Sequence, residues 1–170
     1  AELEAFGENE PGGPIDPVIL LLRHGARVNG WDIDREGDPL FDAVLMNHIE
    51  AAQLVLAHGA DPNIQDNEGT SPLRYCALKG YLEMARLLLL CGATKTIDEW
   101  GGPGALTALG FAARGLHVGM VKLLLAHGAD PQGQSVDRLT PLDCLQFAAA
   151  SEVDAAAQAR LSEIRLLLGA

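Results

Sequence analysis

The sequence predicts an all-α protein assembled from tandem copies of one unit, and three observations lead to this prediction. Leucine-rich runs end in Gly-Ala pairs at intervals of 34, 33 and 36 residues, beginning at Gly25, Gly59, Gly92 and Gly128. A second marker recurs in phase about half a unit earlier, in the segments 38–40, 71–73, 107–109 and 140–142. Residues that favour the start and the end of a helix bracket the same runs. The chain is therefore an array with a period close to 33 residues.

The repeated segments resemble the ankyrin repeat, a β-turn followed by two antiparallel helices with a Thr-Pro-Leu-His-like start. The resemblance covers roughly residues 16–168 and rests on segments such as Ser71-Pro72-Leu73 and the Gly-Ala pairs. It implies an ankyrin-repeat solenoid of antiparallel helix pairs with projecting β-turn fingers. At the end of the array, an apolar stripe predicts a long C-terminal capping helix, and it consists of Val153, Ala157, Leu161, Ile164 and Leu168.

Each helix has its own start and stop signals. The hydroxyl of Ser71 or Thr140 can cap the first helix of its repeat, and the proline that follows suits the first helical position. The second helices contain the apolar runs, at 49–56, 82–89 and 118–125, and the glycine after each run can take the left-handed C-cap conformation. The family motif has a histidine after Pro-Leu that bonds within the turn. We expect this bond to be lost in four copies, because the position holds Phe41, Arg74, Gly110 and Asp143.

The markers also divide the chain. We expect residues 1–14 to be an N-terminal segment, partly helical or loose, and residues 15–170 to be the repeat domain. The repeats are placed at about 1–32 (partial), 33–65, 66–98, 99–134 and 135–170. Inserts near residue 31 and within 98–104 lengthen two fingers.

The composition limits the kinds of partner. A net charge of −11 in 170 residues argues against nucleic acid or an anionic membrane, because phosphate binding depends on clusters of lysine and arginine. The apolar run 87–90, like every other apolar run in the sequence, is far shorter than the roughly 20 residues that span a bilayer. We expect a soluble monomer whose partner is a protein with a neutral or basic surface. We expect the cytoplasm by default, or the periplasm or the exterior if Ala1 follows a cleaved signal peptide.

The reactive side chains do not form a recognisable site, and we expect no catalytic residue, cofactor or metal. His24, His58 and His127 precede three of the Gly-Ala pairs, but equivalent positions of stacked repeats lie about 8–10 Å apart, too far to share one zinc ion. We expect these histidines to interact with carbonyls at helix ends. Segment 32–37 imitates a calcium loop, yet Ala43 stands where the bidentate glutamate is required. The three cysteines are expected to be free thiols.

The resemblance implies that a partner binds to the fingertips and to the exposed face of the first helices, which together form a concave groove. The candidate protein-binding residues at these positions are Trp31, Asp34, Arg35, Leu45, Met46, Asn67, Glu68, Leu78, Lys79, Trp100 and Arg114. The same mapping includes Thr70, Leu106, Val136 and Phe147. The two tryptophans would be aromatic anchors of the interface. The alternative is that they pack over neighbouring fingers and close gaps left by the inserts.

Three functions remain open from the sequence. The first is a non-catalytic protein-protein interaction module. The second is an inhibitor or immunity-type protein whose fingers block a specific enzyme. The third is a hydrolase that uses finger carboxylates such as Asp32, Asp34 and Asp98.

Overall fold

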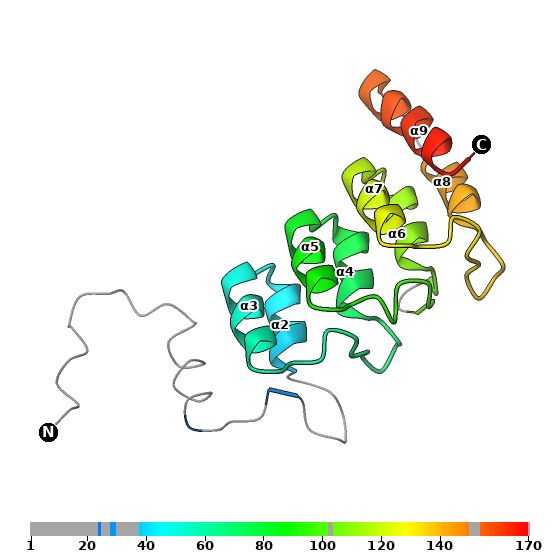
Figure 1. The fold of residues 1–170 in the computed structure, drawn as a ribbon. Helices are drawn as coiled ribbons and strands as arrows, with labels where there is room; N and C mark the ends of the chain where they lie inside the picture. The colour runs from blue at the N-terminus through cyan, green and yellow to red at the C-terminus, as the bar shows by residue number, and fades with distance from the viewer. Residues whose placement is uncertain (1–23, 25–27, 30–37, 102–103, 150–153, 170) are drawn as a thin grey trace, which may run out of the picture.

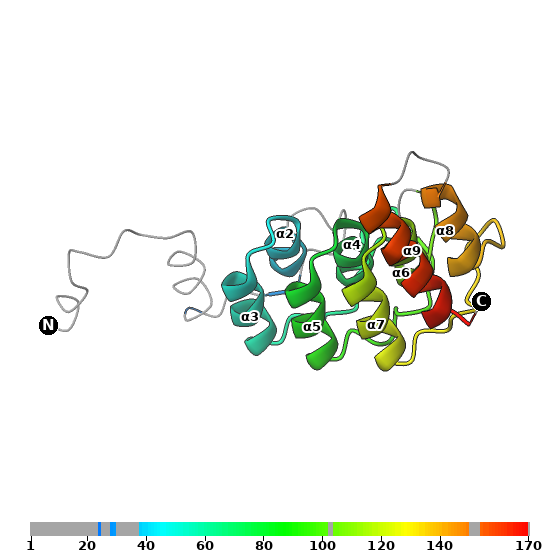
Figure 2. The same cartoon turned by 90° about the horizontal axis from the view of Figure 1, so that it is seen from above.

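A stack of helix pairs makes up the part of the chain that the computed structural model describes, namely residues 24, 28–29, 38–101, 104–149 and 154–169 (Figure 1). Within these ranges the helices are α2 (Pro39–Leu45), α3 (Ile49–Ala57), α4 (Pro72–Lys79), α5 (Leu82–Leu90), α6 (Ala108–Arg114), α7 (Val118–Ala126), α8 (Pro141–Ala149) and α9 (Ala155–Leu167). Figures 1 and 2 show α2, α4, α6 and α8 in one layer and α3, α5 and α7 in the other, with α9 across the end. The all-α solenoid is thus confirmed.

The helix pairs lie inside the intervals 33–65, 66–98, 99–134 and 135–170. The expected N-terminal segment 1–14 and most of the expected partial repeat lie outside the described residues. None of the helices in the described ranges has the length and apolarity needed to cross a bilayer.

The first helices begin at side-chain caps, as the sequence predicted. The hydroxyl of Ser71 accepts a bond from the Arg74 amide at 3.3 Å, and Asp38 caps α2 in the same way through the amide of Leu40 at 2.9 Å. Proline follows both caps, where no intrahelical amide bond is required. The predicted cap at Thr140 is also confirmed, since its hydroxyl accepts from the Asp143 amide at 3.2 Å.

The second helices end at the Gly-Ala pairs. Gly59 has a φ of 90°, and Gly92 and Gly128 have φ of 95° and 90°, so the predicted left-handed C-caps are confirmed. The amide of Ala60 then reaches back to the carbonyl of Val55 at 3.0 Å, which is the Schellman closure. Ala60, Ala93 and Ala129 of these three pairs are buried, so each pair combines a turn with a small side chain at a crowded position.

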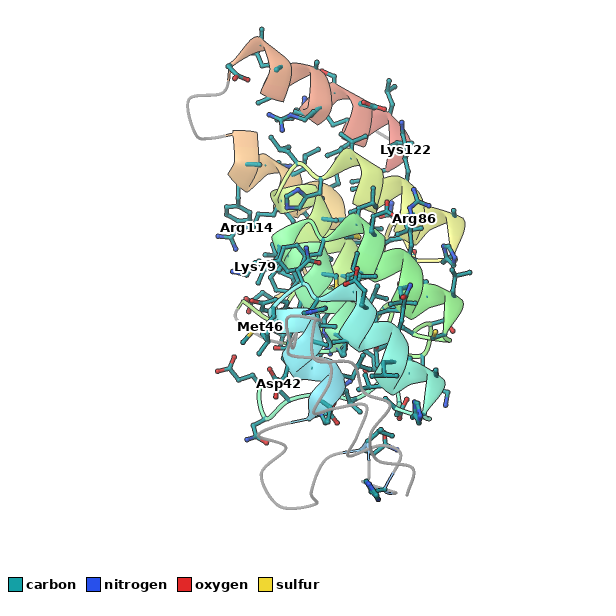
Figure 3. The ribbon with its side chains drawn as sticks, turned by 90° about the vertical axis from the view of Figure 1, so that its left-hand side faces the viewer. Asp42, Met46, Lys79, Arg86, Arg114 and Lys122 are labelled. Carbon is teal, nitrogen blue, oxygen red and sulfur yellow. The ribbon has the colours of Figure 1, made fainter. Side chains whose placement is uncertain are left out.

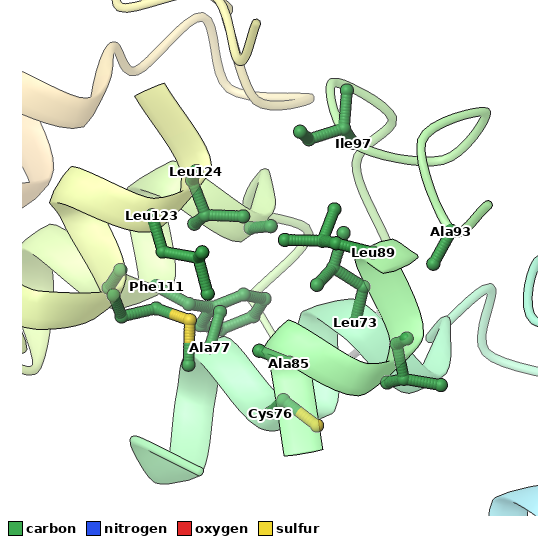
Figure 4. Close-up of a cluster of buried hydrophobic side chains, with 14 of the residues drawn as sticks. Leu73, Cys76, Ala77, Ala85, Leu89, Ala93, Ile97, Phe111, Leu123 and Leu124 are labelled. Atoms are coloured by element: carbon green, nitrogen blue, oxygen red, sulfur yellow. The ribbon is translucent and has the colours of Figure 1, made fainter. Parts of the chain in front are cut away.

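The core runs continuously between the two helix layers. Figure 4 shows one section of it, where side chains of α4, α5, α6 and α7 meet: Leu73, Cys76, Ala77, Ala85, Leu89, Phe111, Leu123 and Leu124. The alanines on the first helices let neighbouring helices approach closely, while leucines fill the space between layers. At the C-terminal end, Leu161, Ile164 and Leu168 are buried, and α9 covers α7 and α8 as the predicted capping helix.

Asparagine side chains join the turns of successive repeats. Nδ2 of Asn29 donates to the carbonyl of Gly59 at 3.2 Å, and its Oδ1 accepts from the amide of Asp61 at 2.9 Å. Asn63 repeats the first of these bonds one unit later, on Gly92 at 3.0 Å. These bonds fix the step from one repeat to the next in addition to the apolar core.

The expected loss of the turn bond in four copies is wrong for two of them. In α8, Oδ2 of Asp143 accepts from the amide of Thr140 at 2.9 Å and from its hydroxyl at 2.7 Å. A carboxylate at the third helical position can reach back to the cap, as in a capping box. In α4, Nη2 of Arg74 donates to the carbonyl of Gly69. A different side chain therefore supplies a turn bond from the position where the family has histidine.

We predict that Asp143→Ala lowers the free energy of unfolding by about 1 kcal/mol near neutral pH, because the cap loses these bonds. The bonds from the hydroxyl and amide of Thr140 lower the pKa of Asp143 below its ordinary value. The carboxylate's contribution is therefore complete above the unfolded pKa of about 3.9 and is lost as the pH falls through the lower folded value. Urea titrations over this range measure it, with exposed Asp137→Ala as control. Equal decreases in the free energy of unfolding of Asp143→Ala and Asp137→Ala would contradict the stabilising role of the Asp143 bonds.

We predict that Gly101→Ala destabilises the protein by about 1–3 kcal/mol, because its methyl group would overlap the carbonyl oxygen of Gly69 on the preceding finger. Thermal and urea unfolding measure the loss. The matched control is Gly119→Ala on the exposed side of α7, where the added carbon meets only a methyl end of Leu82 and helix propensity improves. A Gly101 variant as stable as the control would show that the two fingers do not need this close approach.

Candidate protein-binding surface

A tight turn shapes the finger at residues 65–70. Oδ1 of Asp66 accepts from the amides of Glu68 at 2.9 Å and Thr70 at 2.7 Å, and the Asp66 amide donates to the Thr70 carbonyl at 3.0 Å. The side chains of Asn67 and Glu68 are exposed at the tip. The expectation that Thr70 lines the surface is wrong, because its two bonds to Asp66 draw it under the turn, where it is buried.

The next finger, 98–106, presents Trp100. This residue is 52% exposed, so the neighbouring fingers do not enclose it. The base of this finger is closed by the bond from the Gly101 amide to the Leu106 carbonyl at 3.4 Å, and Leu106 is buried there. The expectation that Leu106 lines the surface is therefore also wrong. Nε2 of Gln65 donates to a carboxylate oxygen of Glu99, which links this finger to the preceding one.

A buried guanidinium lies beneath these two fingers. Arg74 is fully buried, and its Nη2 bonds the carbonyl of Gly69. Its Nε and Nη1 have no hydrogen-bond partner among the described residues. Burial lowers the pKa of Arg74, while the negative charges of Glu99 and Asp66 oppose that change. This role of Arg74 is not among the predictions from the sequence, although an arginine in place of the motif's histidine is a signal for it.

The ends of the first helices form a second part of the surface. Met46 is 83% exposed, and Leu45, Leu78, Lys79 and Arg114 are exposed as well. Figure 3 shows Met46, Lys79 and Arg114 one after another along one edge of the stack, with Arg86 and Lys122 on the other side. Apolar and cationic groups from successive repeats thus share one edge, which the spacing of the sequence predicted.

An aromatic cluster supports this edge. Tyr75 contacts Phe41 and Tyr81, each at a ring centroid distance of 6.3 Å. Nζ of Lys79 lies 5.5 Å from the centroid of the Tyr75 ring, within the range of a cation–π contact. This cluster was not predictable from the repeat register, because its members come from different repeats and from different positions within a repeat.

Three candidate residues, Trp31, Asp34 and Arg35, lie outside the described residues. The same holds for the whole of the calcium-like segment 32–37. Asn67, Glu68 and Trp100 on the fingers and the candidates on the helix ends remain as the described parts of the surface.

Two of the three histidines, His58 and His127, bond to helix-end carbonyls as expected. Nδ1 of His58 lies 2.9 Å from the carbonyl of Leu54, and Nδ1 of His127 lies 2.9 Å from that of Leu123. In the described ranges, no group of three or more histidine, cysteine, aspartate or glutamate side chains is arranged to hold a metal ion.

The three cysteines are free, as the sequence predicted, and they differ in accessibility. Cys91 is exposed after α5, whereas Cys76 and Cys144 are buried. Burial raises the pKa of the Cys76 and Cys144 thiols, and the charge of Asp143 adds to the effect on Cys144. Neither buried thiol is suited to act as a nucleophile, because the reactive form is the thiolate.

Comparison with known families gives two matches to this chain. The description "Ankyrin repeats (many copies)" matches residues 40–89, from α2 into α5. The description "Ankyrin repeat" matches residues 106–135, which contain α6 and α7.

Curated proteins with similar sequences include the Cyclin-dependent kinase 4 inhibitor B of Rattus norvegicus, 33% identical over 91 residues, 52% of this chain and 68% of that protein. The B-cell lymphoma 3 protein homolog of Mus musculus is 38% identical over 81 residues, 48% of this chain and 18% of that protein. The ARF GTPase-activating protein GIT2 of Homo sapiens is 32% identical over 77 residues, 45% of this chain and 10% of that protein. The chain thus spans two thirds of the first relative but less than a fifth of the other two.

We predict that one of the three thiols reacts rapidly with a disulfide reagent in the native protein, because only Cys91 is exposed. Cys76 and Cys144 should react only after denaturant is added. The absorbance of the released thiolate counts the groups, and Cys91→Ser should abolish the rapid phase. Rapid reaction of a second thiol would contradict the buried positions in α4 and α8.

Proposed function

This chain belongs to the ankyrin repeat family and is a protein-protein interaction module, and we propose that it binds its partner through the fingertips and the exposed ends of the first helices. The observation that carries this proposal is the exposure of large apolar side chains on that side of the stack. Met46 and Trp100 are 83% and 52% exposed, and Phe147 is 60% exposed on α8. Clustered apolar and aromatic groups that are open to solvent mark interaction sites in soluble proteins.

The partner is proposed to bind in the expected concave groove between the fingers and the first helices. The acidic tips support a neutral or basic partner surface at the fingers, because Glu68, Glu99 and Asp137 are all exposed there. In this proposal the module itself performs no catalysis.

A second candidate is the inhibition of an enzyme by occlusion. One relative is named as an inhibitor of a cyclin-dependent kinase, and this chain spans 68% of its length. An irregular, lengthened finger with a half-exposed tryptophan suits insertion into a cleft. In this candidate function, binding of the chain silences its target stoichiometrically.

The third hypothesis, a hydrolase that uses finger carboxylates, has less support. Oδ1 of Asp98 accepts the amide of Asp130 at 2.8 Å, which is a bond between successive turns. Asp32 and Asp34, the other carboxylates of that hypothesis, lie outside the described residues.

We predict that Met46→Ala/Trp100→Ala weakens binding of the partner at least tenfold, because buried apolar and aromatic anchors typically contribute more than about 1 kcal/mol each to an interface. The partner is isolated by affinity capture on the full chain, identified by mass spectrometry and measured against both proteins by calorimetry. If the partner is an enzyme, its activity is assayed with and without stoichiometric protein, which separates the inhibitor from the general module.

The matched control is Leu90→Ala/Leu166→Ala, which removes two exposed leucines, 83% and 76% accessible, from α5 and α9. The control should bind like the wild type. Equal binding by the Met46/Trp100 variant and the wild type, with unchanged folding by circular dichroism, would refute the proposed surface.

A further inference from the structure

The basic side chains on the two helix layers differ in their pairing. On the second helices, Nε of Arg86 lies 3.4 Å from a carboxylate oxygen of Glu83, and Nζ of Lys122 lies 2.6 Å from one of Glu163. Within the described residues, no carboxylate forms an ion pair with Lys79 or Arg114 on the first helices. Two cations on the edge proposed to bind the partner thus lack an ion pair within the described residues. Asp42 of α2 lies on the same edge (Figure 3).

Neighbouring aromatic side chains restrict the position of the Lys79 side chain. Its Nζ lies 5.5 Å from the centroid of the Tyr75 ring, and that ring contacts Phe41 and Tyr81, each at a centroid distance of 6.3 Å. A cation–π contact of this kind orders the side chain without neutralising its charge. An incoming anion would therefore meet an ammonium group whose conformational freedom is already reduced.

These cations belong to a row of exposed side chains that crosses the repeats. The helix-end row consists of Leu45, Met46, Leu78, Lys79, Arg114 and Phe147. Leu45, Leu78, Arg114 and Phe147 occupy the same position of successive first helices, 33, 36 and 33 residues apart. Packed helices are spaced by about 8–10 Å, so each step of the row matches about three residues of an extended chain at roughly 3.3 Å per residue.

From repeat to repeat, the row is apolar on α2, both apolar and cationic on α4 (Leu78 and Lys79), cationic on α6 (Arg114) and apolar on α8 (Phe147). Resting on the proposed function, we propose that the helix-end row binds an extended segment of the partner protein that carries two carboxylates between apolar side chains. The carboxylates, about three residues apart, pair with Lys79 and Arg114, and the apolar groups contact Met46 and Phe147.

The charges of Lys79 and Arg114 determine the electrostatic part of this contact, although the chain as a whole is acidic. At physiological ionic strength the Debye length is about 8 Å, so exposed carboxylates farther away are largely screened. A nucleic acid does not fit, because two cations in a chain of net charge −11 cannot supply a phosphate-binding surface. The acidic fingertips would therefore favour a basic part of the partner, and the cationic helix-end row would favour an acidic part of the same partner.

The test uses a phage-displayed library of random peptides about twelve residues long, since three repeat steps of about 10 Å need roughly nine extended residues. The full chain should enrich peptides with carboxylates flanked by apolar residues. Fluorescence polarisation of an enriched peptide should show a roughly 2- to 30-fold weaker affinity for Lys79→Gln/Arg114→Gln, as expected for two ion pairs of moderate strength. The affinity should also fall as salt is added.

The matched control is Arg86→Gln/Lys122→Gln, which makes the same change in net charge on the second helices. This control should bind the peptide like the wild type. Enriched peptides without carboxylates, equal binding by the two double variants, or the absence of any enrichment would each overturn the proposal. Self-association of the chain that disappears in Lys79→Gln/Arg114→Gln would assign the row to a second copy and would overturn it as well.

Failure of this inference can be told apart from failure of the proposed function. If a captured partner no longer binds Met46→Ala/Trp100→Ala but still binds Lys79→Gln/Arg114→Gln, the proposed binding surface stands and the proposed acidic segment is refuted. If the partner binds both variants with the affinity of the wild type, the proposed surface itself is refuted.

Discussion

The stacking of each helix pair on the next is the interaction on which the rest of this structure depends. One pair cannot enclose its own apolar side, so the leucines of a second helix and the alanines of a first helix are buried only when a neighbouring pair covers them. The contacts between α4 and α6, between α6 and α8, and between α5 and α7 provide this cover, and α9 provides it at the C-terminal end. The buried alanine of each Gly-Ala pair and the side chain of Asn63 then hold successive turns at a constant step.

This arrangement leaves the functional variety to the exposed parts of each repeat. Side chains at equivalent positions of the first helices face solvent in every copy, so their chemistry can change without loss of core packing. In this chain they change from Leu45 and Leu78 to Arg114 and Phe147. The second helices show the opposite tendency, because Arg86 and Lys122 are neutralised by neighbouring carboxylates. The contrast between the two layers is one reason for placing the proposed partner surface on the first helices.

Much of the fold could be predicted because its determinants are local. A capping hydroxyl such as that of Ser71, a proline at the first helical position and a glycine with positive φ act within a few residues. Much of the candidate surface followed from the same register, including the exposed positions of Met46 and Arg114. The errors came where local spacing was not enough: Thr70 and Leu106 were placed on the surface but are buried by the closure of their fingers. The turn bond was judged lost, although a carboxylate on Asp143 restores it.

The helices, the period and the C-terminal helix α9 follow from the sequence alone, because they depend on propensities and caps that act locally along the chain. The tertiary structure decided which side chains meet across repeats. It brought Phe41, Tyr75 and Tyr81 into one cluster beneath Lys79, and it buried Arg74 between two fingers. The physical reason is that burial and charge pairing depend on neighbours about one repeat away in the chain, and only the stacked helices define which neighbours those are.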